Sequence, residues 1–259
     1  MTNDKVIGIV GGVGPQAGID LHSKIIKHTN SGGTDQGHLR VCHLSFADLI
    51  ADRTEFLAKP NYLENPAEGV NFVMNRLHEI GVEIVGIPCN TMHVPSILDP
   101  IKKLAGNYEI EFVDMVEEVV SYLDEFMPGI KRIGVLSTQG TYDSQMYPNK
   151  LSAKGYSVLV PDKKIQVGCV QDAIYNREYG IKACSSEIDP RAHSRIMRGF
   201  KDLQIKGAQA VILACSEIPL VIREDMVDGV HIIDSTDILA KALVRAANPE
   251  KLLVKVKSY

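Results

Sequence analysis

The chain has 259 residues, a formal net charge of −4 at pH 7, and 45% hydrophobic residues. This length supports one large domain or two lobes with a sizeable core. The negative charge argues against nucleic acid and anionic membrane surfaces as partners. No apolar run reaches the roughly 18 residues of a membrane-spanning helix. The polar residues 1–5 lead directly into a predicted strand, which does not resemble a signal peptide.

The first half of the chain alternates between strand and helix patterns. It begins with a predicted strand at 5–10, a tight loop at 11–15 and a predicted helix at 16–29. A second strand at 40–46 follows, then a helix at 65–80 that ends at Gly81, and further strands at 83–87 and 109–113. This alternation is typical of a parallel sheet with helices on both faces.

The second half repeats the alternation. Strands are predicted at 132–136, 156–160, 210–213 and 230–233. One helix is predicted from about Tyr142, and a longer one from Ser185 or Ser186 to near Gly207. Residues 251–259 fit either an edge strand or a frayed tail. The fold class is therefore α/β.

The two halves align with each other at a constant offset. IGIVGGVG at residue 7 matches IGVLSTQG at 133, and GVEIVGIPCN at 81 matches GAQAVILACS at 207; both offsets are 126. FVDM at 112 and IIDS at 232 match at an offset of 120, so an insertion or deletion separates them. We therefore expect two pseudo-symmetric α/β lobes with a site in the cleft between them. The N-terminal lobe would comprise residues 1–115 with 233–259, and the C-terminal lobe residues 116–232.

Five cysteines, an odd number at irregular spacings, argue against a disulfide framework. The sequence contains no CxxC or HExxH motif. We therefore expect a reduced, cytoplasmic protein without a metal site. The cysteines are Cys42, Cys89, Cys169, Cys184 and Cys215.

Cys89 and Cys215 occupy equivalent positions of the repeat, 126 residues apart. Each follows an apolar strand and precedes a predicted helix, at the sheet edge where ligands bind in open parallel sheets. A helix N-terminus would lower the pKa of either thiol, and Asn90, Thr91 and Ser216 are suitable capping residues or carboxylate donors. A lone cysteine in this position is usually a small buried hydrophobe, but the pairing favours a shared chemical role.

Two thiols that face each other across a cleft suit a particular reaction. Inverting a carbon that bears a hydrogen needs one base to remove the proton and one acid on the opposite face to return it. Cysteine titrates close to working pH after a modest shift, so the same residue type can serve on both sides. The pair therefore predicts a proton-transfer enzyme.

Six motifs carry a resemblance to a known family. They are GGVGP at 11–15, DRT at 52–54, PCNT at 88–91 followed by His93, STQGT at 137–141, IKA at 181–183 and ACSE at 214–217. Together they resemble the pyridoxal-phosphate-independent aspartate/glutamate racemase family over nearly the whole chain. The first glycine loop lacks the Asp-Ser pair of glutamate racemases, so the resemblance is to the aspartate racemase branch. Ser216 and Met92 depart from the usual GCTE and CNTAH motifs, which leaves pocket size and specificity open.

The resemblance implies a cofactor-independent amino acid racemase, expected to be a homodimer, that acts on aspartate or glutamate. Cys89 and Cys215 would be the catalytic acid and base. Arg53 and Lys182 would hold the side-chain carboxylate of the substrate, as a guanidinium fork or an ammonium can. The α-carboxylate would be held by side chains and loop N–H groups that stabilise the developing charge. The substrate-binding residues other than Arg53 and Lys182 would be Gly12, Val13, Asn90, Thr91, Thr138, Gly140, Thr141 and Ser216.

Three alternatives stay open at this point. Residues 12–17 fit the GxGxxA pattern of NAD(P)-binding oxidoreductases, but the second predicted strand does not end in an acidic ribose-binding residue, and Asp48 lies slightly late. A hydantoin racemase, or a related isomerase or decarboxylase, would share the fold and one or both thiols. Arg53 and Lys182 favour an acidic amino acid instead. A non-catalytic binding protein would not need both thiols.

Overall fold

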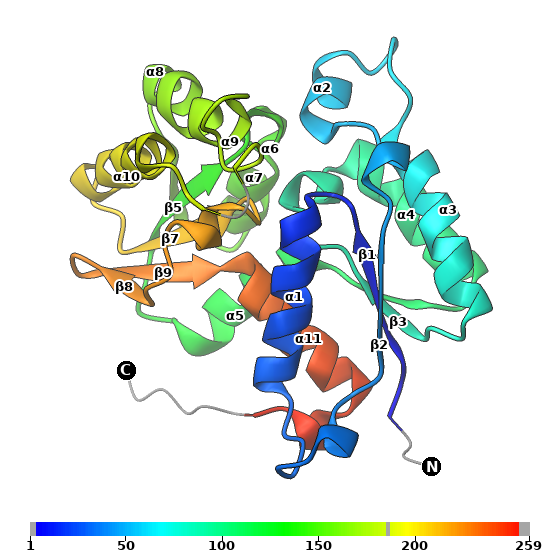
Figure 1. The fold of residues 1–259 in the computed structure, drawn as a ribbon. Helices are drawn as coiled ribbons and strands as arrows, with labels where there is room; N and C mark the ends of the chain where they lie inside the picture. Colours follow the sequence, from blue (N-terminus) through cyan, green and yellow to red (C-terminus); the bar gives the residue numbers. More distant parts are fainter. Residues whose placement is uncertain (1–3, 185–186, 254–259) are drawn as a thin grey trace.

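The computed structural model describes residues 4–184 and 187–253 and contains two separate sheets (Figure 1). The first sheet has the strand order β2-β1-β3-β4 and is entirely parallel. The second has the order β6-β5-β7-β9-β8 and is parallel except for the hairpin pair β8–β9. This confirms the predicted α/β class with parallel sheets.

The first half of the chain forms the first sheet and most of its helices. Its strands are β1 (Ile7–Gly11), β2 (Val41–Ser45), β3 (Ile84–Gly86) and β4 (Glu111–Val113). Its helices are α1 (Pro15–His28), α2 (Arg53–Ala58), α3 (Pro66–Glu79), α4 (Pro95–Asn107) and α5 (Met115–Phe126). All four predicted strands and both predicted helices are confirmed within two residues at each end.

The second half forms the second sheet. Its strands are β5 (Arg132–Ser137), β6 (Ser157–Leu159), β7 (Ala210–Ala214), β8 (Met226–Val227) and β9 (Val230–Asp234). Its helices are α6 (Gln139–Ser144), α7 (Met146–Ala153), α8 (Lys163–Ile165), α9 (Asp172–Tyr175), α10 (Pro190–Ile205) and α11 (Ser235–Ala247), with a π-helical segment η4 (Gln166–Gln171). The helix predicted from Tyr142 is two helices, because Gln145 adopts a left-handed conformation between them.

The predicted start of the long helix α10 at Ser185 or Ser186 is wrong. Those two serines lie outside the described residues, and α10 begins at Pro190. Asp189 caps it by accepting a hydrogen bond from the Arg191 backbone N–H, and proline fits the first helical position because its missing N–H would have no partner there. An aspartate followed by proline is a stronger start signal than either serine.

The strand order supports the repeat found in the sequence. β1 and β5 correspond at the offset of 126, as do β3 and β7, and each sheet keeps its equivalents in the same order. Gly81 and Gly207 end equivalent helices with φ of 79° and 86°. Only glycine adopts this left-handed conformation without a steric penalty, so both turns into the central strands depend on it.

The strands bury alternate residues against helices on opposite faces. In the first sheet, Val10 and Val85 contact the layer of α3 and α4, whereas Ile7, Ile9 and Ile84 contact α1 and α11. Helix α11 therefore packs on the first sheet although it follows β9 of the second.

Helix α5 makes the reverse crossing. It follows β4 of the first sheet, but Val116, Val119 and Val120 pack against Ile133 and Ile212 of the second sheet. In Figure 1, α11 lies between the two groups of strands. The division of the chain into lobes at residues 115 and 233 stays a prediction.

Helices α1 and α11 are joined by a hydrogen bond to the Asp237 carboxylate that gives a testable pH effect. His28 Nε2 lies 2.6 Å from Asp237 Oδ1, and Lys241 Nζ lies 2.7 Å from Asp237 Oδ2. Burial acts to raise the pKa of Asp237, but the hydrogen bond from His28 and the charge of Lys241 outweigh it and hold that pKa far below the usual range. The ionised form is thus the one that the fold stabilises.

We expect Asp237→Asn to lower the free energy of unfolding at pH 7 by about 1–3 kcal/mol. A carboxyl with a depressed folded pKa stabilises the fold fully above its unfolded pKa of about 3.9. This contribution decreases as the pH falls below that value and disappears only below the lower pKa of the folded state, so the difference between variant and wild type should shrink in acid. Urea unfolding of variant and wild type at pH 7 and at about pH 3 measures the stability difference at each pH. The control replaces the exposed Asp99 by asparagine. A stability difference that does not shrink in acid would contradict the assignment.

None of the helices in the two described ranges combines the length and apolar composition that crossing a bilayer requires. At the C-terminal end, Leu252 forms an isolated antiparallel bridge with Thr29. Residues 254–259, the rest of the segment with two alternative predictions, lie outside the described residues.

Candidate active site

Cys89 and Cys215 both lie at the carboxyl ends of central strands. Cys89 follows β3 and is 7% exposed, and Cys215 directly follows β7 and is 4% exposed. All five cysteines are free. The repeat therefore brings a buried thiol to the same edge of each sheet, where ligands bind in parallel α/β folds.

The predicted helix directly after each thiol is wrong. Each cysteine is followed by a single 3-10 turn, η3 (Asn90–His93) or η5 (Ile218–Leu220). After η3, Val94 is extended with ψ of 131°, because the following Pro95 disfavours a helical conformation for the residue before it. Neither thiol is at the N-terminus of a multi-turn helix, so the helix dipole that the sequence predicted for each site is absent.

Three hydroxyl groups from the two halves of the chain meet near Cys89. Thr91 Oγ1 lies 3.0 Å from Thr138 Oγ1 and 3.0 Å from Thr141 Oγ1. Thr138 also caps α6, and a Cβ on Gly140 would lie 3.1 Å from the Thr91 methyl group. These four predicted site residues are therefore close together, and their hydroxyls present donors of the kind a carboxylate accepts.

Asn90 is held between two helices of the second half of the chain, α7 and α11, rather than acting as a cap. Its Oδ1 accepts a hydrogen bond of 2.6 Å from Tyr147 Oη, and its Nδ2 donates to Ser235 Oγ at 3.1 Å. Ser235 in turn donates to the Leu213 carbonyl of β7 at 2.9 Å. All three side chains are buried.

We expect Tyr147→Phe to lower the free energy of unfolding by about 1–2 kcal/mol, because the Asn90 carbonyl oxygen loses a buried donor. Thermal or urea unfolding measures the loss. Tyr62→Phe is the control, since Tyr62 is 87% exposed. Equal stability of Tyr147→Phe and wild type would show that another donor reaches Asn90.

His93 fixes the backbone of Cys89. Its Nε2 accepts a hydrogen bond of 3.2 Å from the Met115 backbone N–H, so Nδ1 carries the proton and donates to the Cys89 carbonyl at 3.0 Å. Burial lowers the pKa of His93 and outweighs the opposing charge of Asp114. The imidazole is therefore neutral and positions the thiol-bearing turn.

Cys215 is the first member of a polar chain that the sequence analysis missed. Its Sγ donates to Glu217 Oε2 at 3.0 Å, and Glu217 Oε1 forms an ion pair with Lys182 Nζ at 3.1 Å. Ser216, a predicted binding residue, donates to the same Oε2 at 3.4 Å. Glu217 is 5% exposed. A charged residue directly after a buried strand, within the ACSE motif, was the signal that could have identified it.

This environment reverses the predicted effect on the second thiol. Burial and the neighbouring Glu217 carboxylate raise the pKa of Cys215 well above its ordinary value, although Lys182 acts to lower it. For Glu217, burial acts to raise the pKa, but Lys182, the Cys215 thiol and Arg53 together lower it. The stable state thus pairs a protonated thiol with an ionised carboxylate.

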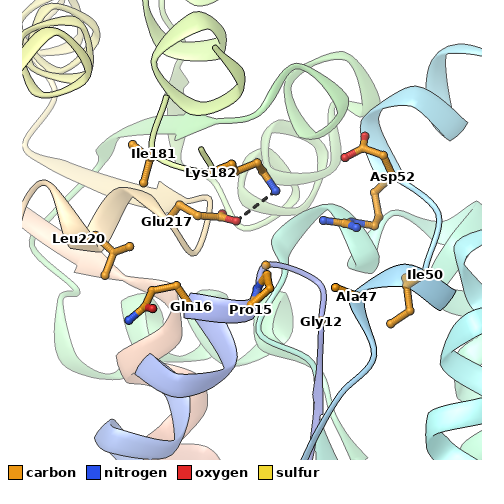
Figure 2. Close-up of a pocket in the computed structure, with 12 residues that line it drawn as sticks. Gly12, Pro15, Gln16, Ala47, Ile50, Asp52, Ile181, Lys182, Glu217 and Leu220 are labelled. Atoms are coloured by element: carbon orange, nitrogen blue, oxygen red, sulfur yellow. Dashed lines mark ion pairs between the residues drawn. The ribbon is translucent and has the colours of Figure 1, made fainter. Parts of the chain in front are cut away.

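A pocket of ≈ 360 Å³ adjoins this chain of polar groups, and Figure 2 shows Lys182 and Glu217 directed toward it from one side and Asp52 from the other. Gly12, Arg53 and Lys182 are the predicted binding residues that line it; Cys89 and Cys215 are not among its lining residues. The lining residues come from both halves of the chain: Gly12, Gly14, Pro15, Gln16, Ala47, Ile50, Asp52, Arg53, Ile181, Lys182, Glu217 and Leu220.

Arg53 is a buried cation, and one of its hydrogen-bond donors is unused among the described residues. It is 6% exposed, its Nη2 donates to the Val13 carbonyl at 3.1 Å, and its Nε has no hydrogen-bond partner among the described residues. Burial acts to lower the pKa of Arg53, but electrostatic interactions with neighbouring groups, Cys89 and Asp52 first among them, raise it above its ordinary value. Arg53 is therefore charged, near Cys89, and able to bind an anion.

The glycine loop at residues 11–15 lies against Glu217, the hydrogen-bond partner of Cys215. Gly14 has φ of 122°, and a Cβ there would lie 2.5 Å from Glu217 Oε1. A pyrophosphate bound at this loop would face that carboxylate, which argues against the dinucleotide alternative. Within the described ranges, no group of three His, Cys, Asp or Glu side chains is arranged to hold a metal ion.

The model of the Asp/Glu/Hydantoin racemase family matches residues 10–243. The chain belongs to this family. It is accordingly an isomerase of the racemase type, and the dinucleotide-binding oxidoreductase alternative falls away. Its similarity to individual members extends over most of its length.

Two relatives of this racemase match nearly end to end. The broad specificity amino-acid racemase RacX of Bacillus subtilis is 24% identical over 247 residues, which cover 92% of this chain and 96% of the relative. The structure of Picrophilus torridus aspartate racemase is 27% identical with a TM-score of 0.78, covering 97% of this chain and 96% of that one.

The fold extends to more distant racemases. The structure of glutamate racemase from Francisella tularensis, in complex with D-glutamate, has a TM-score of 0.65 at 19% identity and covers 99% of this chain and 86% of that chain. At this identity the likeness shows a shared fold. It fits the two-sheet architecture described above.

Proposed function

We propose that this racemase interconverts L- and D-aspartate, with glutamate as a second substrate, by two-base proton transfer between Cys89 and Cys215 and without a cofactor. The observation that carries the proposal is the pair of buried thiols at equivalent ends of equivalent strands. One thiolate removes the Cα proton, and the thiol on the opposite side donates its own proton to the carbanion-like carbon. The two thiols exchange roles in the reverse reaction.

The charges of the pocket support an acidic amino acid. Arg53 and Lys182 line it as cations, and the free Arg53 Nε can donate to a side-chain carboxylate. Similar proteins are named as an aspartate racemase, glutamate racemases and a broad specificity amino-acid racemase. Aspartate and glutamate both occur among these names, and the two cations suit the side-chain carboxylate of either.

The hydroxyl cluster of Thr91, Thr138 and Thr141 suits the α-carboxylate. Removing the Cα proton moves negative charge toward that carboxylate, so donors fixed around it stabilise the transition state more than the ground state. We propose that the three hydroxyls, with Asn90, supply this stabilisation. The backbone N–H groups of Gly12, Val13 and Gly140 would add to it. The expected homodimer and cytoplasmic location stay predictions.

The test is proton NMR in D2O without added cofactor, on both enantiomers of aspartate, of glutamate and of a panel of neutral amino acids. Loss of the Cα–H signal of aspartate, with appearance of the opposite enantiomer by chiral chromatography, is the expected result. Exchange confined to neutral amino acids would keep the proton chemistry and contradict the role of Arg53 and Lys182. No exchange on any amino acid would contradict the proposal.

A further inference from the structure

The two thiols have electrostatically opposite surroundings. Cys215 contacts the carboxylate of Glu217 at 3.0 Å, an arrangement in which the thiol is the hydrogen-bond donor. Cys89 instead interacts electrostatically with the buried guanidinium of Arg53. A cation favours a thiolate and a carboxylate disfavours one. The repeat thus gives the two cysteines equivalent positions in the fold but different neighbours.

The Glu217 carboxylate is held in its place from three sides. Lys182 Nζ pairs with Oε1 at 3.1 Å, and the Ser216 hydroxyl donates to Oε2 at 3.4 Å. On the third side, Gly14 approaches the carboxylate so closely that a Cβ added at this position would lie 2.5 Å from Oε1. Glu217 is also one of the residues that line the pocket. Its position therefore links the pocket to the thiol.

We propose that Glu217 is a positioning residue that keeps Cys215 protonated in the substrate-free racemase, so that Cys215 enters the reaction as the proton donor. This inference rests on the proposed two-thiol mechanism. The charged groups around the two thiols are Glu217 and Lys182 on the Cys215 side, and Arg53 with its neighbour Asp52 toward Cys89. The two sheets are related by a repeat, but the site starts each cycle from one preferred proton arrangement.

The proton balance follows from this arrangement. In one turnover, the Cys89 thiolate takes the Cα proton, and the Cys215 thiol gives its proton to the opposite face of Cα. The product leaves behind a Cys89 thiol and a Cys215 thiolate, and the thiolate now lies beside the Glu217 carboxylate. Repulsion between these two anions drives Cys215 to recover a proton from solvent while Cys89 releases one, which restores the resting state.

The experiment measures the reactivity of each thiol in the substrate-free protein. Wild type and Glu217→Gln are alkylated with iodoacetamide across a range of pH, and peptide mass spectrometry gives separate rates for Cys89 and Cys215. Each rate is divided by its own plateau at high pH, which removes differences in access. Glu118→Gln is the matched control, since Glu118 pairs with Arg245 at 2.6 Å outside the pocket lining.

In wild type we expect the normalised rate of Cys215 at pH 8 to be below that of Cys89. In Glu217→Gln we expect it to rise about tenfold, because a neutral amide no longer opposes the thiolate. Cys89 and the Glu118→Gln control should stay within about twofold of wild type. The inference is overturned if Cys215 is the more readily ionised thiol in wild type, or if Glu217→Gln changes only the plateau, as a purely structural residue would.

The wild-type comparison stands even where Glu217→Gln does not fold. Alkylation does not depend on turnover, so its result is separate from that of the proposed function. A protein that exchanges no Cα proton would contradict the two-thiol racemase while leaving the order of the two thiols measurable. Conversely, an active racemase with equally ionised thiols would contradict only the inference.

Discussion

Racemisation of aspartate is expected to fall by at least about 10³-fold when either Cys89 or Cys215 is replaced by serine. A positioned acid or base contributes roughly 10²–10⁴-fold to a proton transfer, and a serine hydroxyl is far too weak an acid to replace a thiol near neutral pH. The measurement is the rate of enantiomer interconversion. In D2O, each single variant should retain at most exchange of the enantiomer whose Cα proton faces the remaining thiol.

Cys42→Ser is the control for this pair of substitutions. Cys42 lies within β2, and Cys42 is only partly buried. It has no equivalent in the repeat, so its replacement should leave the racemisation rate within about twofold of wild type. Activity that survives in the Cys89→Ser, Cys215→Ser double variant would rule out the two-thiol mechanism.

Arg53→Met is expected to lower kcat/KM for aspartate by about 10²-fold. Loss of a charge-assisted bond to a buried carboxylate costs several kcal/mol, because the carboxylate is then desolvated without a partner. Methionine fills a similar volume, so the pocket should keep its shape. Steady-state kinetics on aspartate and on a neutral amino acid separate the two effects, since only aspartate brings a side-chain carboxylate.

Arg76→Met is the matched control for Arg53→Met. Arg76 is an exposed arginine that pairs with Glu79 on α3, and its replacement should leave kcat/KM unchanged. Thermal unfolding of Arg53→Met checks that the loss of its bond to the Val13 carbonyl does not unfold the protein. An equal loss of kcat/KM on aspartate and on neutral amino acids would assign Arg53 a general role in place of substrate selection.

The strands were predictable because their signals are local and repeated. Buried parallel strands such as β1 and β7 are short apolar runs with turn residues at their ends, and a constant offset of 126 aligns one half with the other. The two cysteines were found as a pair for the same reason. Gly81 and Gly207, which end equivalent helices, strengthen the alignment.

The charged neighbours of each thiol could not be predicted from the sequence. Whether a thiol is near an anion or a cation depends on side-chain contacts between segments far apart in the chain, such as Lys182 with Glu217. The helix-dipole argument for Cys215 failed because the chain forms one 3-10 turn there, and the thiol donates to Glu217 two residues ahead. The predicted substrate-binding roles stay predictions.

The exchange of helices between the sheets sets the order in which the chain can be completed during synthesis. The first sheet is translated early, but one of its faces is covered by α11, which starts at Ser235. Until that helix has been synthesised, apolar residues such as Ile7 and Ile84 lack part of the layer that buries them, and exposed apolar surface promotes aggregation. The first sheet is therefore completed only after the chain has been synthesised through α11, which follows the last strand of the second sheet, and folding of the two halves is completed together.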